Sequence, residues 1–206
     1  MENYKKNLEL LTKNYVYSKE MEHDACGVGL IASTEGKKSR AIIEYGIEAL
    51  KAVWHRGAVD ADGKTGDGAG IHVEIPKDFF IEKIEVTGHT HDNSEICVGM
   101  IFLPRNDYAA QESCKTIVES ELTKNDFSIY GWRQVPVNPK VLGEKAFQTM
   151  PEIIQVLFKS NNPELLNKDL ERKIYETRRI IENKAFKISL NNFYICSLSS
   201  KSIIYK

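Results

Sequence analysis

The chain has 206 residues, 42% of them hydrophobic and 28% charged, which is an ordinary composition for a globular protein with one good core. Its 28 basic and 29 acidic residues give a net charge of −1, and this balance argues against a nucleic-acid-binding or membrane-surface protein. No apolar stretch approaches the ~20 residues that would span a bilayer. The polar N-terminus also lacks the hydrophobic region of a secretory signal.

The four cysteines lie far apart and form no C-x-x-C pair: Cys26, Cys97, Cys114 and Cys196. Without a signal peptide, this spacing argues against a disulfide framework or a zinc site and favours the reducing cytoplasm. Cys97 and Cys196 fall inside apolar runs, so we expect them to be small buried hydrophobic residues in strands. The histidines show no metal-ligand spacing with cysteine or glutamate, and we expect no metal site in this chain.

The first quarter of the chain predicts a leader, a strand and a helix. Residues 1–25 carry scattered apolar side chains without a sustained period, and we interpret them as a peripheral leader with at most a helical turn or two. The apolar run at 27–32 predicts the first strand, and residues 33–38 predict a turn. Ser39 can cap a helix that runs to about His55.

The apolar face of that helix has members four, three and four residues apart: Ile43, Ile47, Leu50 and Trp54. Gly57 stands just past the last of them and is expected to end the helix. Residues 57–70 are so rich in glycine and aspartate that they predict a loop, and residues 71–76 alternate as a strand.

Two familiar motifs fail in this loop. Gly63-Lys64-Thr65 resembles the end of a P-loop, but the required first glycine falls at Ala58 and the segment follows a helix. Asp60-x-Asp62 begins like a calcium loop, but the twelfth position is Ile71 rather than glutamate. The loop is therefore either a glycine-rich turn with solvated aspartates or part of a different kind of site.

The rest of the chain alternates in blocks rather than in strict strand–helix–strand order. Strands are predicted at 96–103, 128–137, 152–158, 193–198 and 202–205. Helices are predicted at 109–124 and at 163–183, and the second has Leu166, Leu170, Ile174 and Ile181 on its inward face. Residues 77–85 are expected to form a short helical or irregular piece, and residues 143–149 a loop or a single turn. This order favours an α+β fold with helices on mostly antiparallel sheets. The chain also stops inside a predicted strand, so we expect a piece of a longer protein.

Cys26 is the candidate nucleophile, because the glycines that follow it let another group approach the sulfur closely. A cysteine needs a base, and His23 or His72 are conceivable partners. The alternative is the α-amino group of Cys26 itself, freed by cleavage of the Ala25–Cys26 bond. An α-amine has an ordinary pKa of about 7.7–8.0 and can exchange a proton with the thiol of the same residue.

Arg56 stands at the end of the helix and the mouth of the loop. Two interpretations are open: an ordinary surface ion pair, or a guanidinium fork that binds a substrate carboxylate with two parallel hydrogen bonds.

These residues resemble a known family. Cys26-Gly-Val-Gly-Leu-Ile-Ala and residues 46–71, with His-Arg-Gly-Ala-Val-Asp-Ala-Asp-Gly-Lys-Thr-Gly-Asp-Gly-Ala-Gly, closely resemble the start of glutamate synthase large subunits. That segment is a class II glutamine amidotransferase domain of the N-terminal-nucleophile hydrolase fold, a four-layer αββα sandwich of antiparallel sheets. A weaker resemblance extends to the end of the chain and includes Phe193-Tyr-Ile-Cys-Ser-Leu-Ser-Ser.

The resemblance implies roles for several residues. Cys26 would attack the side-chain amide of glutamine, release ammonia and leave a glutamyl thioester for water to hydrolyse. Arg56 would hold the α-carboxylate of glutamine, and the pocket would be flanked by Gly57, Thr65, Gly66 and Asp67. Residues 1–25 would be a propeptide, and residues 26–206 the first part of the amidotransferase domain.

The resemblance also implies parts that lie beyond residue 206: the oxyanion-hole Asn-Gly pair, the FMN and iron–sulfur domain and the other synthase domains. We therefore expect a fold that is incomplete at the C-terminus and a chain that is inactive in isolation. The implied partners are glutamine, the downstream domains, and a small NAD(P)H-oxidising subunit or ferredoxin. The alternatives are another class II amidotransferase and a non-catalytic fragment.

Overall fold

The computed structural model describes residues 2–14 and 27–206. Its helices are α1 (Glu2–Asn14), α2 (Arg40–Ala52), α3 (Lys77–Val86), α4 (Tyr108–Lys124), α5 (Glu144–Thr149) and α6 (Asn167–Lys187), with the 3₁₀ helices η1 (Trp54–Arg56) and η2 (Pro139–Val141). Its strands are β1 (Ile71–Glu74), β2 (Cys97–Leu103), β3 (Phe127–Gln134), β4 (Glu152–Ser160), β5 (Tyr194–Ser199) and β6 (Ser202–Tyr205).

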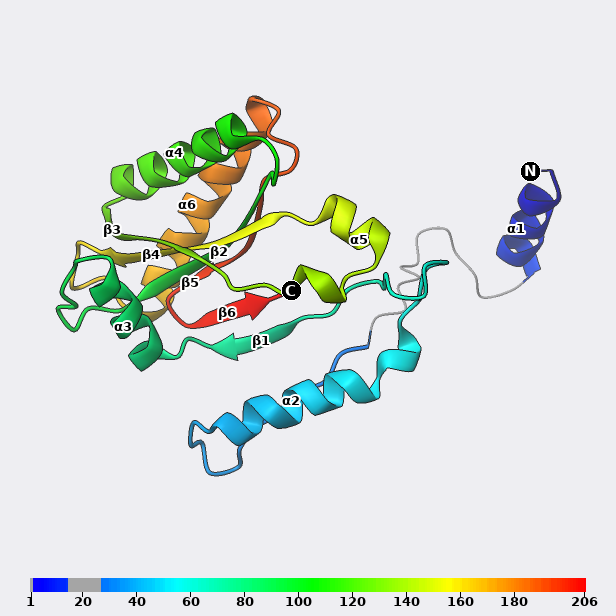
Figure 1. Ribbon diagram of the computed structural model, residues 1–206, viewed down its shortest axis with the longest axis horizontal. Helices are drawn as coiled ribbons and strands as arrows, with labels where there is room; N and C mark the ends of the chain where they lie inside the picture. Colours follow the sequence, from blue (N-terminus) through cyan, green and yellow to red (C-terminus); the bar gives the residue numbers. More distant parts are fainter. Residues whose placement is uncertain (1, 15–26) are drawn as a thin grey trace.

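The strands form two antiparallel sheets that pack face to face. One sheet has four strands in the order β3-β4-β2-β5, and the other pairs β1 with β6. Helices α4 and α6 cover the outer face of the four-stranded sheet, and α2 lies beside β1 of the two-stranded sheet (Figure 1). The layers are thus helix, sheet, sheet and helix, which confirms the α+β sandwich predicted from the sequence.

Strand β2 is a continuous apolar run because each of its two faces is buried in a separate apolar core. Cys97, Ile101 and Leu103 belong to a buried cluster with the side chains of α4 and α6. Val98 and Met100 point the other way, into a second cluster between the two sheets. A strand that is buried on both faces needs apolar residues at every position.

The structure confirms that Cys97 and Cys196 are buried inside strands. Burial raises the pKa of both thiols, so neither is activated as a nucleophile. Cys114 is also buried, on α4, and burial raises its pKa to about 11.

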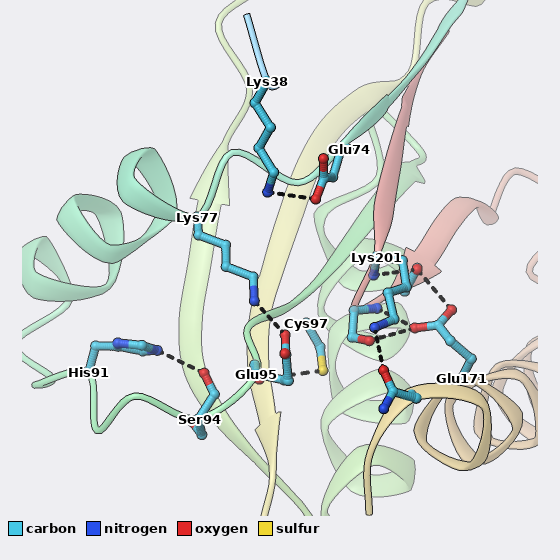
Figure 2. A network of polar contacts seen from close by, with 12 residues as sticks. Lys38, Glu74, Lys77, His91, Ser94, Glu95, Cys97, Glu171 and Lys201 are labelled. Atoms are coloured by element: carbon cyan, nitrogen blue, oxygen red, sulfur yellow. Dashed lines mark hydrogen bonds and ion pairs between the residues drawn. The ribbon is translucent and has the colours of Figure 1, made fainter. Parts of the chain in front are cut away.

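Polar contacts fasten the layers at their edges (Figure 2). Glu171 on α6 accepts hydrogen bonds from the hydroxyl and backbone amide of Ser200, each at 2.7 Å, and so holds the turn between β5 and β6. Lys38, just before α2, forms an ion pair of 2.6 Å with Glu74 on β1. The second contact ties the start of the α2 layer to the two-stranded sheet.

The strand expected at 27–32 is not formed. No described segment pairs with these residues, and Val28 and Leu30 are 96% and 88% exposed. An apolar run becomes a strand only where a neighbouring strand supplies hydrogen-bond partners. The prediction of a first strand next to Cys26 is therefore wrong.

Two side chains that were expected to point inward are exposed. Trp54 is 73% exposed, because α2 ends at Ala52 and the tighter η1 turns the indole out of the apolar stripe. Leu166 is 49% exposed, because it precedes α6 as its cap instead of lying within the helix. Both errors come from helix ends that differ from the predicted ones.

The remaining element predictions differ mainly in extent. Ser39 caps α2 as predicted, and its hydroxyl accepts a hydrogen bond from the Ala41 amide at 3.1 Å. Residues 2–14 form a helix of 13 residues, longer than the turn or two expected in the leader. The stretch 143–149 contains the short helix α5. Within the described part of the chain, no helix is both long and apolar enough to cross a membrane.

Candidate active site

The candidate site is built around the passage from α2 into the loop 57–70. Cys26 and His23 lie outside the described residues, and so does the side chain of Arg56. The backbone of Arg56 ends η1, and the Gly57 amide donates to the Trp54 carbonyl at 3.0 Å. Gly57 has an ordinary φ of −85° and leads the chain into an extended segment, so it ends the turn without adopting a left-handed conformation.

The loop is a small closed hairpin rather than an open turn. Val59 and Gly66 form an antiparallel bridge, and the Asp60 amide donates to the Thr65 carbonyl at 2.8 Å. Outside that bridge, the Asp67 carboxylate accepts a hydrogen bond from the amide of Ala58 at 2.8 Å. These contacts place residues 65–67 directly opposite the residues that follow Arg56.

The segment that follows Cys26 lies beside the end of α2, where the loop 57–70 also begins. A Cβ atom on Gly27 would stand 3.9 Å from Cγ2 of Val53, at the end of α2. Gly27 is bonded to Cys26, and Val53 comes shortly before Arg56 in the chain. The structure thus brings together the flanks of the predicted nucleophile, of the predicted arginine and of the loop.

Asp62 is a residue of this region that the sequence did not single out as part of the site. Its carboxylate accepts hydrogen bonds from the Thr65 hydroxyl at 2.5 Å, the Thr65 amide at 2.7 Å and the Lys64 amide at 2.9 Å. These bonds, chiefly the one from the Thr65 hydroxyl, hold the pKa of Asp62 well below its usual range. The only signal in the sequence is an aspartate followed closely by a threonine, which is a common turn pattern.

His72, one of the conceivable bases, lies on β1. Its Nε2 atom is 2.6 Å from the Ser202 hydroxyl on the neighbouring strand β6. Among the residues that the structure describes, no three or more histidine, cysteine, aspartate or glutamate side chains group together in a way that could hold a metal ion.

Comparison with known proteins identifies the family. A profile of the class II glutamine amidotransferases matches residues 26–206. The NADPH-dependent glutamate synthase large chain of Azospirillum brasilense is 52% identical over 203 residues, or 98% of this chain. A ferredoxin-dependent glutamate synthase of Pyropia yezoensis is 39% identical over 205 residues (96% of this chain), and ferredoxin-dependent glutamate synthase 1 of Arabidopsis thaliana is 38% identical over 187 residues (90%).

The chain spans only 13%, 13% and 11% of the lengths of these three relatives, respectively. The family profile, in contrast, matches from Cys26 to the last residue of the chain. This chain therefore belongs to the class II glutamine amidotransferases, in the form that glutamate synthases carry, as its motifs predict.

Proposed function

We propose that this chain is the glutaminase unit of a glutamate synthase. It hydrolyses glutamine to glutamate and ammonia, and the ammonia is used for the reductive amination of 2-oxoglutarate. The observation that carries the proposal is that the family match begins at Cys26, which leads into an exposed segment with two glycines. The other three cysteines are buried, and burial raises the pKa of each thiol.

The proposed chemistry is nucleophilic catalysis by the Cys26 sulfur. The thiolate attacks the side-chain amide carbon of glutamine, the C–N bond breaks, and the departing nitrogen takes a proton and leaves as ammonia. Water then attacks the γ-glutamyl thioester, breaks the C–S bond and releases glutamate. The base is the α-amino group of Cys26, which takes the thiol proton and delivers it to the leaving nitrogen.

This base requires that Cys26 be the first residue of the mature protein, so we propose that residues 1–25 are a propeptide and residues 26–206 belong to the amidotransferase domain. The match to the Azospirillum protein covers 98% of this chain, so that relative also carries a segment similar to most of residues 1–25. His72 is a weaker candidate for the base, because its Nε2 already contacts Ser202.

Substrate recognition is assigned to the hairpin loop and the arginine before it. We propose that Arg56 binds the α-carboxylate of glutamine and that the pocket is lined by Gly57, Thr65, Gly66 and Asp67. The closure of the loop by the Val59–Gly66 bridge supports this assignment, because it places 65–67 beside the chain that leaves Arg56.

The synthase reaction needs groups that we place outside this chain. We propose that FMN and an iron–sulfur cluster are held by other domains of the full-length protein, and that electrons come from a small NAD(P)H-oxidising subunit or from ferredoxin. The names of the relatives support both donors, since they include NADPH-dependent and ferredoxin-dependent enzymes. We also propose a cytoplasmic location.

The decisive experiment measures ammonia release from glutamine by the full-length protein and its Cys26→Ala variant. We expect the activity of the wild type to vanish in the variant, and the intact mass of the active wild type to lack residues 1–25. Glutamine hydrolysis that survives in the variant would overturn the nucleophile. An active protein that keeps its leader would overturn the α-amine as the base, and a wild type without any glutaminase activity would favour a non-catalytic role.

A further inference from the structure

The hairpin loop 57–70 is fastened to a second segment far along the chain, which begins at Gly143. This glycine precedes α5 and is buried, and its backbone lies directly on the side chains of Asp62 and Thr65. A Cβ atom at this position would come within 3.0 Å of Asp62 Oδ2 and of Thr65 Oγ1, closer than real Cβ atoms approach other atoms. Only glycine fits here without displacement of the loop.

Polar contacts strengthen the same junction. The backbone amide of Glu144, in the first turn of α5, lies near the Asp62 carboxylate and helps to lower the pKa of that carboxyl. One residue later, Lys145 forms an ion pair of 2.6 Å with Asp60. Asp62 is therefore held by hydrogen bonds within its own loop and lies directly against the start of α5.

We propose that Asp62, together with Gly143, is a positioning element for glutamine binding, a role that rests on the glutaminase function proposed above. The Asp62 carboxylate organises the loop through its hydrogen bonds with Thr65, and it also packs against Gly143 at the start of α5. The loop is thereby held with residues 65–67 against the residues that follow Arg56. Asp62 touches no reacting atom in this scheme and acts through the placement of its neighbours.

The hydrogen bonds give a physical reason why this position must be a carboxylate. An ionised carboxylate accepts hydrogen bonds at both of its oxygens, whereas a neutral amide offers a single acceptor oxygen. Asp62→Asn can keep the contacts with the Thr65 and Lys64 amides, but its NH₂ group cannot accept a hydrogen bond from the Thr65 hydroxyl. Asp62→Ala removes all of these bonds.

The first test is steady-state glutamine hydrolysis by the full-length protein. We expect Asp62→Ala and Gly143→Ala each to raise KM for glutamine about tenfold, with kcat changed much less, and Asp62→Asn to fall between the wild type and Asp62→Ala. The matched control is Asp169→Asn, an exposed aspartate in the first turn of α6, which we expect to keep wild-type constants. Because Asp62 and Gly143 act through one junction, the double Ala variant should show a KM increase well below the product of the two single effects.

The second test does not depend on catalysis. Hydrogen exchange of the peptides that cover 58–67 should be faster in Asp62→Ala and in Gly143→Ala than in the wild type and in Asp169→Asn. Unchanged exchange in both variants would overturn the proposal, whatever the activity of the protein. Faster exchange with a wild-type KM would overturn the link to glutamine binding, and a lack of Cys26-dependent hydrolysis in the wild type itself would instead refute the proposed function.

Discussion

The Asp67 carboxylate accepts a hydrogen bond from the backbone amide of Ala58 at 2.8 Å, across nine positions of the chain. Ala58 follows closely on Arg56, so this bond fixes the direction in which the chain leaves η1. It also lies outside the Val59–Gly66 bridge and closes the hairpin at its base. Asp67 thus fixes the backbone that borders the proposed glutamine pocket.

We expect Asp67→Ala to lower kcat/KM for glutamine hydrolysis by about tenfold or more, because the Ala58 amide loses its partner and the base of the hairpin opens. Asp67→Asn keeps an acceptor oxygen at the same place, so it should retain a larger share of the activity. The measurement is steady-state hydrolysis by the full-length protein. Equal losses in both variants would show that the negative charge of Asp67, rather than this hydrogen bond, is what glutamine binding requires.

The sequence predicted the framework of the fold well, because the framework depends on local patterns. The continuous apolar run at 96–103 became the doubly buried strand β2, and the Gly- and Asp-rich stretch 57–70 became a loop. Burial on both faces and the conformational freedom of glycine are properties that residue types express directly.

Apart from the two helix-end errors, the predictions failed where a contact between distant residues decides the structure. The run at 27–32 has the composition of a strand but no described partner, and composition does not reveal whether a partner strand exists. The junction of Asp62 with Gly143 joins two segments far apart in the chain, and no local pattern in either segment predicts that they meet. The family resemblance supplied roles for Cys26 and Arg56, but it pointed to no role for Asp62.

The proposed role of Arg56 predicts that its substitution affects KM for glutamine more than kcat. If its guanidinium binds the α-carboxylate of glutamine, Arg56→Lys and Arg56→Gln should raise KM strongly and leave kcat closer to that of the wild type. A glutamine analogue whose α-carboxylate is amidated lacks the group that Arg56 would bind. Its KM should therefore be nearly the same for the wild type and for the two variants. A fall in kcat at unchanged KM would instead place Arg56 at the reacting amide, and unchanged constants would return it to an ordinary surface ion pair.

Glu121 gives a prediction for the dependence of stability on pH. This α4 side chain is only 6% exposed and lies 2.6 Å from Lys184 on α6 and 3.2 Å from Lys124. The hydrogen bond from Lys184 is the main reason why the pKa of Glu121 is lowered from its ordinary value of 4.5. Because the folded protein binds this proton less readily than the unfolded chain, the contact stabilises the fold fully above pH 4.5 and its contribution is lost as the pH falls further.

We therefore expect Glu121→Gln to lower the free energy of unfolding at neutral pH by about 1.5–3 kcal/mol, the usual range for hydrogen bonds to charged groups. The difference from the wild type should shrink in acid, as Glu121 becomes protonated in the wild type as well. Urea denaturation of both proteins at neutral and at acidic pH measures this difference in the free energy of unfolding. Glu112→Gln, at an exposed pair on the same helix, serves as the control and should change stability little. A destabilisation that is independent of pH would assign the effect of Glu121→Gln to packing rather than charge.

Two glycines in ordered elements should respond to alanine in opposite directions. A Cβ atom on Gly99, in the middle of β2, would lie 2.6 Å from Leu198 Cδ1 and 2.6 Å from Val156 Cγ1. Both neighbours are core residues with little room to move, so we expect Gly99→Ala to destabilise the fold by about 1–3 kcal/mol through overpacking. On Gly46, within α2, the nearest atom would be Ile71 Cδ1 at an ordinary 3.5 Å.

Gly46→Ala should therefore stabilise the protein by about 0.5–1 kcal/mol, because alanine loses less conformational freedom in a helix than glycine does. Thermal unfolding measures both effects: Tm should be higher than that of the wild type for Gly46→Ala and lower for Gly99→Ala. If Gly46→Ala destabilised the protein as much as Gly99→Ala, the approach of α2 to β1 would have to be tighter than the 3.5 Å contact indicates.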